Sequence, residues 1–233
     1  MSGRTSKAWW DGQSELKLNL GCGRNIKPGW VNIDSWKRAD VDLEIDLSTD
    51  FPFEPKSCQF IYSEHFLEHL DWLASEELIA KSFTALRKNG VFRAVVPNFQ
   101  RVFEAYVQGD RAFLENCGGL LQDDYRYYKS VYEEPERVVS ERTKNPPPDW
   151  HVSQKPEDRR NVKLRAREYT SPIEIVDWVV HQYGEHKTLY DSDSLIGTLK
   201  RAGFSKAYRS SFDANLDSSE YFVPASLYIE AIV

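Results

Sequence analysis

A short apolar strand runs into a glycine turn in the stretch Lys17-Leu-Asn-Leu-Gly-Cys-Gly-Arg-Asn25, and the next strand, Trp30-Val-Asn-Ile-Asp34, ends in an acid. Glycine at positions 21 and 23 removes Cβ atoms where a ligand presses against the backbone. A carboxylate at the end of the neighbouring strand is placed to accept hydrogen bonds from a ribose diol. Gly-x-Gly alone also occurs in tight turns that bind nothing, but together the two features predict an adenosine-type cofactor.

The loop after this turn is too short for a dinucleotide site. Such a site needs a helix that opens on a third glycine and directs its positive end at a pyrophosphate. Here Pro28 and Gly29 stop any helix after about one turn. A cofactor without a phosphate, whose amino-acid end needs only a few backbone groups, fits this loop better.

Five sequence elements follow one another at workable spacing. They are Leu18-Asn-Leu-Gly-Cys-Gly23, Gly29-Trp-Val-Asn-Ile-Asp34, Asp46-Leu47 before Phe51-Pro-Phe53, Phe60-Ile-Tyr-Ser-Glu-His-Phe-Leu-Glu-His-Leu70 and Leu86-Arg-Lys-Asn-Gly90. In this order the chain resembles the class I S-adenosylmethionine-dependent methyltransferases, and within them the group labelled type 11. The resemblance covers roughly residues 16–100 and, more loosely, residues 195–233. One departure is Asn25, which stands where the family has a third glycine.

The first half of the chain alternates strands with helices, which favours a parallel sheet. After the two strands already described, strands are expected at 41–46, 60–62 and 91–96, and helices open at Ser75 and Ser171, with Asp193 as the cap of a last helix. The strands at 206–209 and 227–233 would form the antiparallel C-terminal hairpin that the resemblance implies. The expected fold is α/β, a doubly wound, mostly parallel, seven-stranded, Rossmann-like sheet.

Length and composition indicate one domain over residues 1–233, since 41% of the residues are hydrophobic and 28% are charged. Residues 99–170 break the rhythm of the sheet with aromatic, proline-rich and charged pieces, and we interpret them as an inserted helical or loop segment, either a surface loop or a lid over a substrate pocket. The three cysteines support neither a disulfide framework nor a zinc ribbon. No apolar run suits a membrane span and the first residues lack a secretion signal, so a cytoplasmic protein is expected.

Ligands of open α/β sheets lie beyond the carboxyl ends of the strands, which directs attention to the residues just after each strand. Gly21, Cys22 and Gly23 are expected at the methionine end of S-adenosylmethionine, and Asp34 at its ribose. By the same rule Ser35 and Trp36 could border the adenine, and Ser63 follows the fourth strand beside the methyl group. The resemblance adds Asp46 and Leu47, which match the family position at the adenine amino edge. For Asp34 and Asp46, the alternative is an ordinary solvated acid.

Side chains that could act as acids, bases or metal ligands are concentrated in the segment Ser63-Glu-His-Phe-Leu-Glu-His69. If the chain is helical from Glu64, then His65, Glu68 and His69 share one face. His65 or Glu64 could act as general base, because an imidazole changes its protonation near neutral pH. Alternatively, His65, Glu68 and His69 could hold a divalent metal, or all these side chains could be structural. The sequence favours a site without metal.

Two further features are open to two interpretations each. His186 could reach the substrate side, or it could be a surface or capping histidine. The basic residues between 159 and 167 could hold an anionic substrate, but charge runs are usually solvated.

The favoured function is methyl transfer from S-adenosylmethionine to an oxygen or nitrogen of a small molecule, such as a sugar or secondary metabolite. A nucleic-acid methyltransferase and a catalytically silent cofactor-binding module remain alternatives. The net charge of −6 argues against nucleic acid as the partner.

Overall fold

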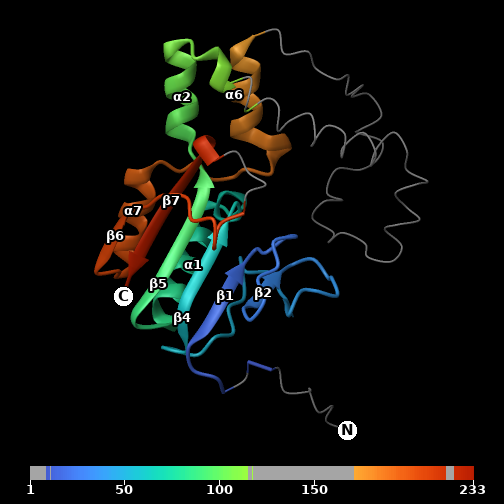
Figure 1. The fold of residues 1–233 in the computed structure, drawn as a ribbon, viewed down its shortest axis with the longest axis vertical. Helices are drawn as coiled ribbons and strands as arrows, with labels where there is room; N and C mark the ends of the chain where they lie inside the picture. Colours follow the sequence, from blue (N-terminus) through green and yellow to red (C-terminus); the bar gives the residue numbers. More distant parts are fainter. Residues whose placement is uncertain (1–8, 11, 115–116, 118–170, 219–222) are drawn as a thin grey trace, which may run out of the picture.

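The computed structural model describes residues 9–10, 12–114, 117, 171–218 and 223–233. Within them one seven-stranded sheet forms the centre of the molecule, with strand order β3-β2-β1-β4-β5-β7-β6 (Figure 1). The strands are β1 (Leu16–Leu20), β2 (Val31–Asp34), β3 (Leu43–Glu44), β4 (Cys58–Glu64), β5 (Leu86–Pro97), β6 (Lys206–Arg209) and β7 (Ser226–Ile232).

The first five strands are parallel, and β7 alone runs against its neighbours. It pairs with β5 from Val91–Ile232 to Pro97–Ser226 and with β6 from Lys206–Ile232 to Arg209–Ile229. The predicted antiparallel hairpin and the predicted α/β sheet are therefore confirmed. The central strands β1 and β4 are almost wholly buried because both faces of a parallel sheet are covered.

Helices α1 (Trp72–Ala85) and α7 (Ser192–Ala202) pack against each other and against the sheet. Their apolar side chains join those of the strands in the main core, which includes Leu18, Ile61, Ile79, Phe92 and Leu199. A second, smaller cluster contains Tyr62 of β4 and Tyr228 of β7, with Phe212 and Leu216 of the segment 210–218 packed against it. Alternate residues of the strands thus face two separate apolar layers, as the period of a β-strand requires.

A second group of helices stands beyond the carboxyl ends of the strands (Figure 1). Helices α2 (Phe99–Gln108) and α6 (Pro172–His181) contact each other there. Three short 3₁₀ segments complete the described elements: η1 (Leu67–His69), η3 (Gln182–Gly184) and η4 (Val223–Ala225). No helix in the described parts of the chain is both long enough and apolar enough to cross a membrane.

Two helices, α1 and α7, begin at other residues than the sequence predicted, as their N-terminal caps show. Helix α1 begins three residues before Ser75, because the side chain of Asp71 accepts a hydrogen bond from Ala74 N at 2.9 Å and so caps the helix. In α7 the cap is Asp191, whose carboxylate accepts from Ser194 N at 2.8 Å, and the predicted cap Asp193 lies in the first turn. Helix α6 begins as predicted, with a capping box at Ser171.

Two strands also differ from the predictions in length. The third strand is only Leu43–Glu44, within the predicted 41–46. Strand β5 starts at Leu86, directly after α1, so that Gly90 lies inside the strand. Of the predicted insertion at 99–170, the first part is α2, whereas residues 118–170, with the basic run, lie outside the described residues. The lid interpretation therefore stays a prediction.

Candidate active site

The glycine turn and Asp34 lie side by side at the carboxyl edge of the sheet. Strands β1 and β2 are parallel neighbours, with Leu20 paired to Ile33, so their ends meet. One carboxylate oxygen of Asp34 accepts a hydrogen bond from Gly23 N at 2.8 Å, and the other accepts from Trp36 N at 2.9 Å. A carboxylate oxygen has a second lone pair, so each can still accept from a ligand.

The two glycines of the turn have different surroundings. Both adopt left-handed backbone, with φ of 60° at Gly21 and 50° at Gly23. A Cβ at Gly21 would lie 2.2 Å from Phe66 Cγ, whereas a Cβ at Gly23 would meet no atom within 4 Å. The expectation that a ligand needs both bare positions is thus corrected, because the protein's own Phe66 fills the space at Gly21. Only Gly23 leaves a side-chain-free space open.

The remaining residues of the predicted cofactor site are divided between surface and core. Ser35 and Trp36 follow β2 and are partly exposed. Asp46 is exposed, and its carboxylate accepts from Ser48 N at 2.9 Å. Leu47, in contrast, is buried in the main core, so its side chain supports the sheet and only its backbone is available to a ligand.

Cys22 and Ser63 are both buried at the ends of central strands. Burial raises the pKa of the Cys22 thiol to about 12, with the nearby Asp34 charge adding to the effect, so the thiol is neutral and unreactive at physiological pH. Ser63 pairs with Leu20 across β4 and β1, and its hydroxyl has no hydrogen-bond partner among the residues that the structure describes. These two positions place small side chains where the two strands approach the turn.

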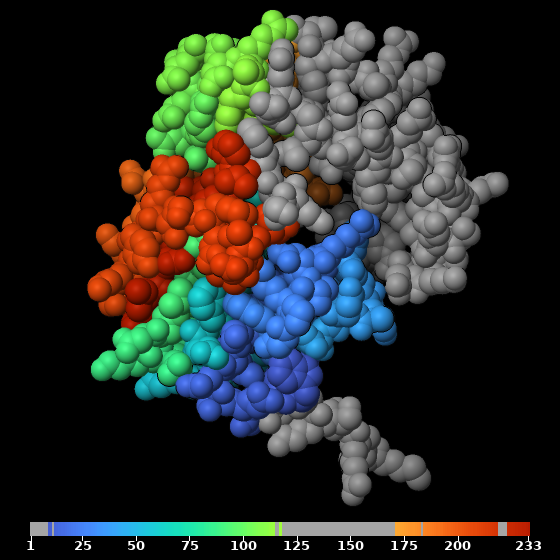
Figure 2. Space-filling view, viewed as in Figure 1, coloured from blue at the N-terminus to red at the C-terminus, as the bar shows by residue number. Residues whose placement is uncertain are grey.

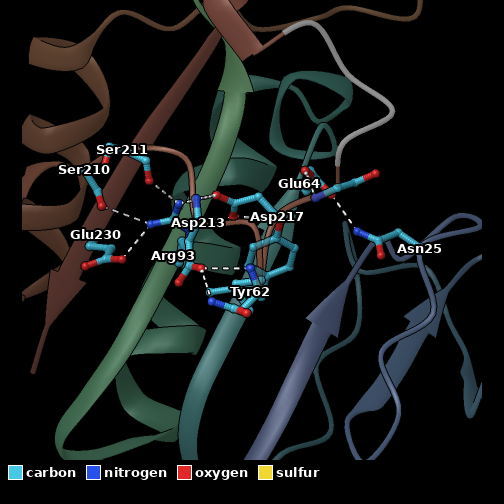
Figure 3. A network of polar contacts seen from close by, with 12 residues as sticks. Asn25, Tyr62, Glu64, Arg93, Ser210, Ser211, Asp213, Asp217 and Glu230 are labelled. Carbon is cyan, nitrogen blue, oxygen red and sulfur yellow. Dashed lines mark hydrogen bonds and ion pairs between the residues drawn. The ribbon is translucent and has the colours of Figure 1, made fainter.

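A buried network of charges holds the segment 210–218 across the sheet (Figure 3). The guanidinium of Arg93 on β5 donates to both oxygens of Asp217, at 2.8 and 2.5 Å, and to Glu230 on β7 at 2.6 Å. Tyr62 also donates to Asp217, at 3.2 Å. Despite burial, these hydrogen bonds raise the pKa of Arg93 above its ordinary value, so the guanidinium stays charged.

The anchored segment reaches the glycine turn through Glu64 (Figure 3). One oxygen of the Glu64 carboxylate accepts from Ser218 N at 2.9 Å and the other from the amide of Asn25 at 2.6 Å. The space-filling view shows the same junction, where the C-terminal segment lies against the N-terminal third of the chain (Figure 2). This bridge was not predicted from the sequence, although Arg93 within the apolar stretch 91–96 is a local signal of a buried ion pair.

The chain is not helical from Glu64 onward, so the condition under which His65, Glu68 and His69 would share one helix face is not met. Glu64 is the last residue of β4, and only Leu67–His69 forms a 3₁₀ turn. Between them His65 adopts left-handed backbone, with φ of 48°, and its N–H donates to Val95 O at 2.8 Å. A non-glycine residue held in this conformation just after a central strand is typical of functional sites.

The side chain of His65 lies between two polar groups. Its Nε2 is 3.2 Å from Ser226 Oγ, and its Nδ1 is 3.3 Å from Glu68 Oε1. The side chain is 15% exposed, whereas that of Glu68 is fully buried. His65 therefore has a carboxylate on one side that can orient the ring, and it keeps limited contact with solvent.

Glu68 lies at the centre of three histidines, His65, His69 and His186. The rings of His69 and His186 have their centroids 5.2 Å apart. One ligand atom each from Glu68, His69 and His186 lies within 4.8 Å of the other two. The metal alternative considered from the sequence combined His65 with Glu68 and His69, whereas the structure brings His186 to Glu68 and His69.

Protonation in this cluster follows from burial and charge. Burial lowers the pKa of His186 to about 4, so its imidazole is neutral at pH 7. Burial alone would raise the pKa of Glu68, but the contact with His65 and the proximity of His69 and His186 hold it below its ordinary value. Glu68 is therefore an ionised carboxylate inside the protein.

Comparison with known proteins identifies the fold of the chain but does not assign it to a family. No protein-family profile matches the chain, and no curated protein matches it in sequence. A SAM-dependent methyltransferase from Archaeoglobus fulgidus is similar in structure, with 13% identity, a TM-score of 0.50 and coverage of 97% of this chain and 88% of that one.

Two further solved structures are similar at lower scores. One is an S-adenosylmethionine-dependent methyltransferase from Mesorhizobium loti, with 14% identity, a TM-score of 0.45 and coverage of 95% and 92%. The other is a possible histamine N-methyltransferase from Thermotoga maritima, with 11% identity, a TM-score of 0.45 and coverage of 93% and 81%. The sheet order and the Archaeoglobus similarity establish the Rossmann-like methyltransferase fold, and membership of the type 11 group stays a prediction.

Proposed function

We propose that the chain is an S-adenosylmethionine-dependent methyltransferase that transfers the methyl group to an oxygen or nitrogen of a small molecule. The observation that carries this proposal is the contact between Gly23 N and the Asp34 carboxylate at the carboxyl edge of β1 and β2. Beside it, the open space at Gly23 suits a nucleoside cofactor that approaches the backbone. Sugars and secondary metabolites are the acceptor classes that we favour.

In this proposal, different residues at the carboxyl edge of the sheet contact different parts of the cofactor. In the proposal, backbone groups of Gly21, Cys22 and Gly23 contact its methionine end, and the free lone pairs of Asp34 accept from its ribose hydroxyls. Ser35 and Trp36 border the adenine, and the exposed carboxylate of Asp46 accepts from its amino group. Leu47 contributes through its backbone, and Ser63 supports the wall of the site from β4.

The cofactor supplies a methyl group that is already activated on a sulfonium sulfur. The protein therefore mainly has to align the acceptor, an effect that can supply about 7–11 kcal/mol of the barrier, and remove a proton where the acceptor carries one. We assign proton removal to His65, with Glu68 as the residue that orients its ring. Glu64 is assigned to holding Asn25 and Ser218, because both of its oxygens already accept hydrogen bonds.

Calorimetric titration with S-adenosylhomocysteine tests the cofactor site. Asp34→Ala removes a charged acceptor for two hydroxyls, and at about 1.5 kcal/mol or more for each hydrogen bond the affinity should fall about 100-fold. Asp50→Ala removes an equally charged, exposed side chain that has no role in the proposed site and should leave the affinity unchanged. Equal affinities of the Asp34→Ala variant and the wild type would count against the proposed site.

The base is tested separately once a screen of small alcohols and amines has identified an acceptor. His65→Gln should leave binding of S-adenosylhomocysteine intact and lower the rate of transfer by about 100-fold to 10,000-fold. The loss should be smallest near high pH, where the acceptor loses its proton without help. A wild-type rate in this variant would remove His65 from the reaction, and a protein that binds the cofactor but methylates nothing would be a silent binding module.

A further inference from the structure

We propose that Glu68, His69 and His186 form a binding site for one divalent transition-metal cation of the zinc type. This site is separate from the proposed cofactor contacts, and it goes beyond the methyltransferase proposal. Its residues come from two distant parts of the sequence. Glu68 and His69 belong to the 3₁₀ turn η1 after β4, and His186 follows η3 beyond helix α6.

The ligand atoms are already close to the distances that a metal requires. One atom from each of the three side chains lies within 4.8 Å of the other two. In a tetrahedral zinc site with bonds of about 2.0–2.1 Å, two ligand atoms are about 3.4 Å apart. Small rotations of the three side chains would therefore bring them into the first coordination sphere without movement of the backbone.

The hydrogen bond of His186 to Val179 leaves Nε2 of the imidazole available to bind a metal. Its Nδ1 lies 2.8 Å from the carbonyl oxygen of Val179, which can only accept, so Nδ1 carries the proton. In the neutral imidazole, Nε2 then has a free lone pair. Metal-binding histidines are typically oriented in this way, by a carbonyl or carboxylate that accepts from the other ring nitrogen.

The two halves of the site are also fixed to each other by backbone hydrogen bonds. The carbonyl oxygen of Glu68 accepts from Lys187 N at 2.8 Å and from Thr188 N at 3.1 Å. The hydroxyl of Thr188 donates to Leu70 O at 2.7 Å. His186 is therefore held beside Glu68 and His69 in the fold itself, as a preformed site requires.

The burial of the Glu68 carboxylate is the feature that a cation would best explain. Its side chain is fully buried, and neither carboxylate oxygen has a hydrogen bond of good geometry among the described residues. One of the two oxygens, Oε1, lies 3.3 Å from His65 Nδ1. A buried carboxylate that lacks full compensation costs several kcal/mol, and a directly bound cation offsets this cost.

The donor set indicates the class of metal. Two imidazoles and one carboxylate suit zinc, cobalt, nickel or ferrous iron, whereas magnesium and calcium prefer oxygen ligands throughout. Three protein ligands leave one coordination position for water or another oxygen ligand, the pattern of catalytic rather than structural zinc sites. Because His65 contacts the same carboxylate, a bound cation would lie next to the proposed base.

The test uses full-length protein freed of metal with a chelator that is then removed. Cobalt is titrated while its visible d–d absorption is followed, and zinc is titrated by calorimetry. Wild-type protein should bind one ion per chain, with a cobalt spectrum free of the intense charge-transfer band of thiolate ligands. Glu68→Gln, His69→Asn and His186→Asn should each weaken binding by about 100-fold or more.

The variants are chosen so that folding and metal binding can be separated. In His186→Asn the amide nitrogen can still donate to Val179 O, whereas the atom that would bind metal is lost. His181→Asn changes an exposed histidine, 67% exposed, and should bind metal as the wild type does. Circular dichroism and the affinity for S-adenosylhomocysteine show whether each variant is folded, and they report on the cofactor site independently of the metal.

Two results would overturn the site. One is wild-type protein that takes up less than one ion per chain at ion concentrations well above that of the protein. The other is wild-type affinity in folded Glu68→Gln or His186→Asn. In either case the cluster of Glu68, His69 and His186 would be a structural polar network without a ligand.

Discussion

Alanine at Gly21 should mainly lower the stability of the protein, whereas alanine at Gly23 should mainly weaken cofactor binding. At Gly21, alanine must adopt a positive φ and place its Cβ 2.2 Å from Phe66 Cγ. The backbone conformation costs about 1 kcal/mol and the overpacking about 1–3 kcal/mol, so Gly21→Ala should lower the free energy of unfolding by about 2–4 kcal/mol. At Gly23 only the backbone cost of about 1 kcal/mol applies, because the space is open.

Urea unfolding followed by tryptophan fluorescence measures these free energies. Gly23→Ala should lose only about 1 kcal/mol of stability. It should lose affinity for S-adenosylhomocysteine by about 10-fold or more, since its methyl group enters the space proposed for the cofactor. In the Gly21→Ala background, Phe66→Ala should cost at least about 1 kcal/mol less than it does in the wild type, because it removes the clash.

Three results would refute this reasoning. Equal destabilisation by the two alanines would mean that Phe66 does not limit the space at Gly21. Unchanged cofactor affinity of Gly23→Ala would mean that the open position at Gly23 faces no ligand. Additive effects of Gly21→Ala and Phe66→Ala would likewise show that the two residues do not compete for the same space.

Three further predictions concern the buried network, the thiols and a helix cap. Arg93→Met leaves Asp217 buried without its cation, and urea unfolding should show a loss of about 3–5 kcal/mol; a loss below about 1 kcal/mol would contradict a structural role. Because the pKa of Cys22 is about 12, its alkylation at pH 8 should be about 1,000-fold or more slower in native than in urea-unfolded protein, and should accelerate about tenfold per pH unit; comparable rates would contradict its burial. Asp191→Ala should cost about 0.5–2 kcal/mol through the lost cap of α7, and Asp193→Ala less; the reverse order in urea unfolding would restore Asp193 as the cap.

The sequence was sufficient for features that depend on neighbouring residues. The turn at Gly21 and Gly23 follows from the need for positive φ, and the cap of α6 at Ser171 follows from the local chemistry of a helix end. The alternation of strands and helices predicted the parallel sheet, because each strand must be covered on both faces. The place of Asp34 beside the turn followed from the same rule, since the ends of parallel strands meet at one edge.

Local signals failed where a tertiary contact overrode them. The spacing of His65, Glu68 and His69 fits a helix, but β4 continues through Glu64 because that residue pairs with Val95 of β5. Asp191 and Asp193 are both acids that could cap α7. Which of them does so depends on the position of the preceding residue Tyr190, whose hydroxyl is hydrogen-bonded to Ser75 of α1. Two neighbouring acids carry no local signal that decides between them.

The composition of the site was decided by contacts between distant segments. Gly21 has no free space because Phe66 packs on it, and Glu64 is occupied because Asn25 and the segment at Ser218 converge on it. His186 joins Glu68 because backbone hydrogen bonds tie residues 187 and 188 to the η1 turn. Residue types and periodicity report which face of an element is buried, but not which distant side chain meets it. For that reason the glycine turn and its acid could be found in the sequence, whereas the buried Glu68 with His69 and His186 could be found only in the folded chain.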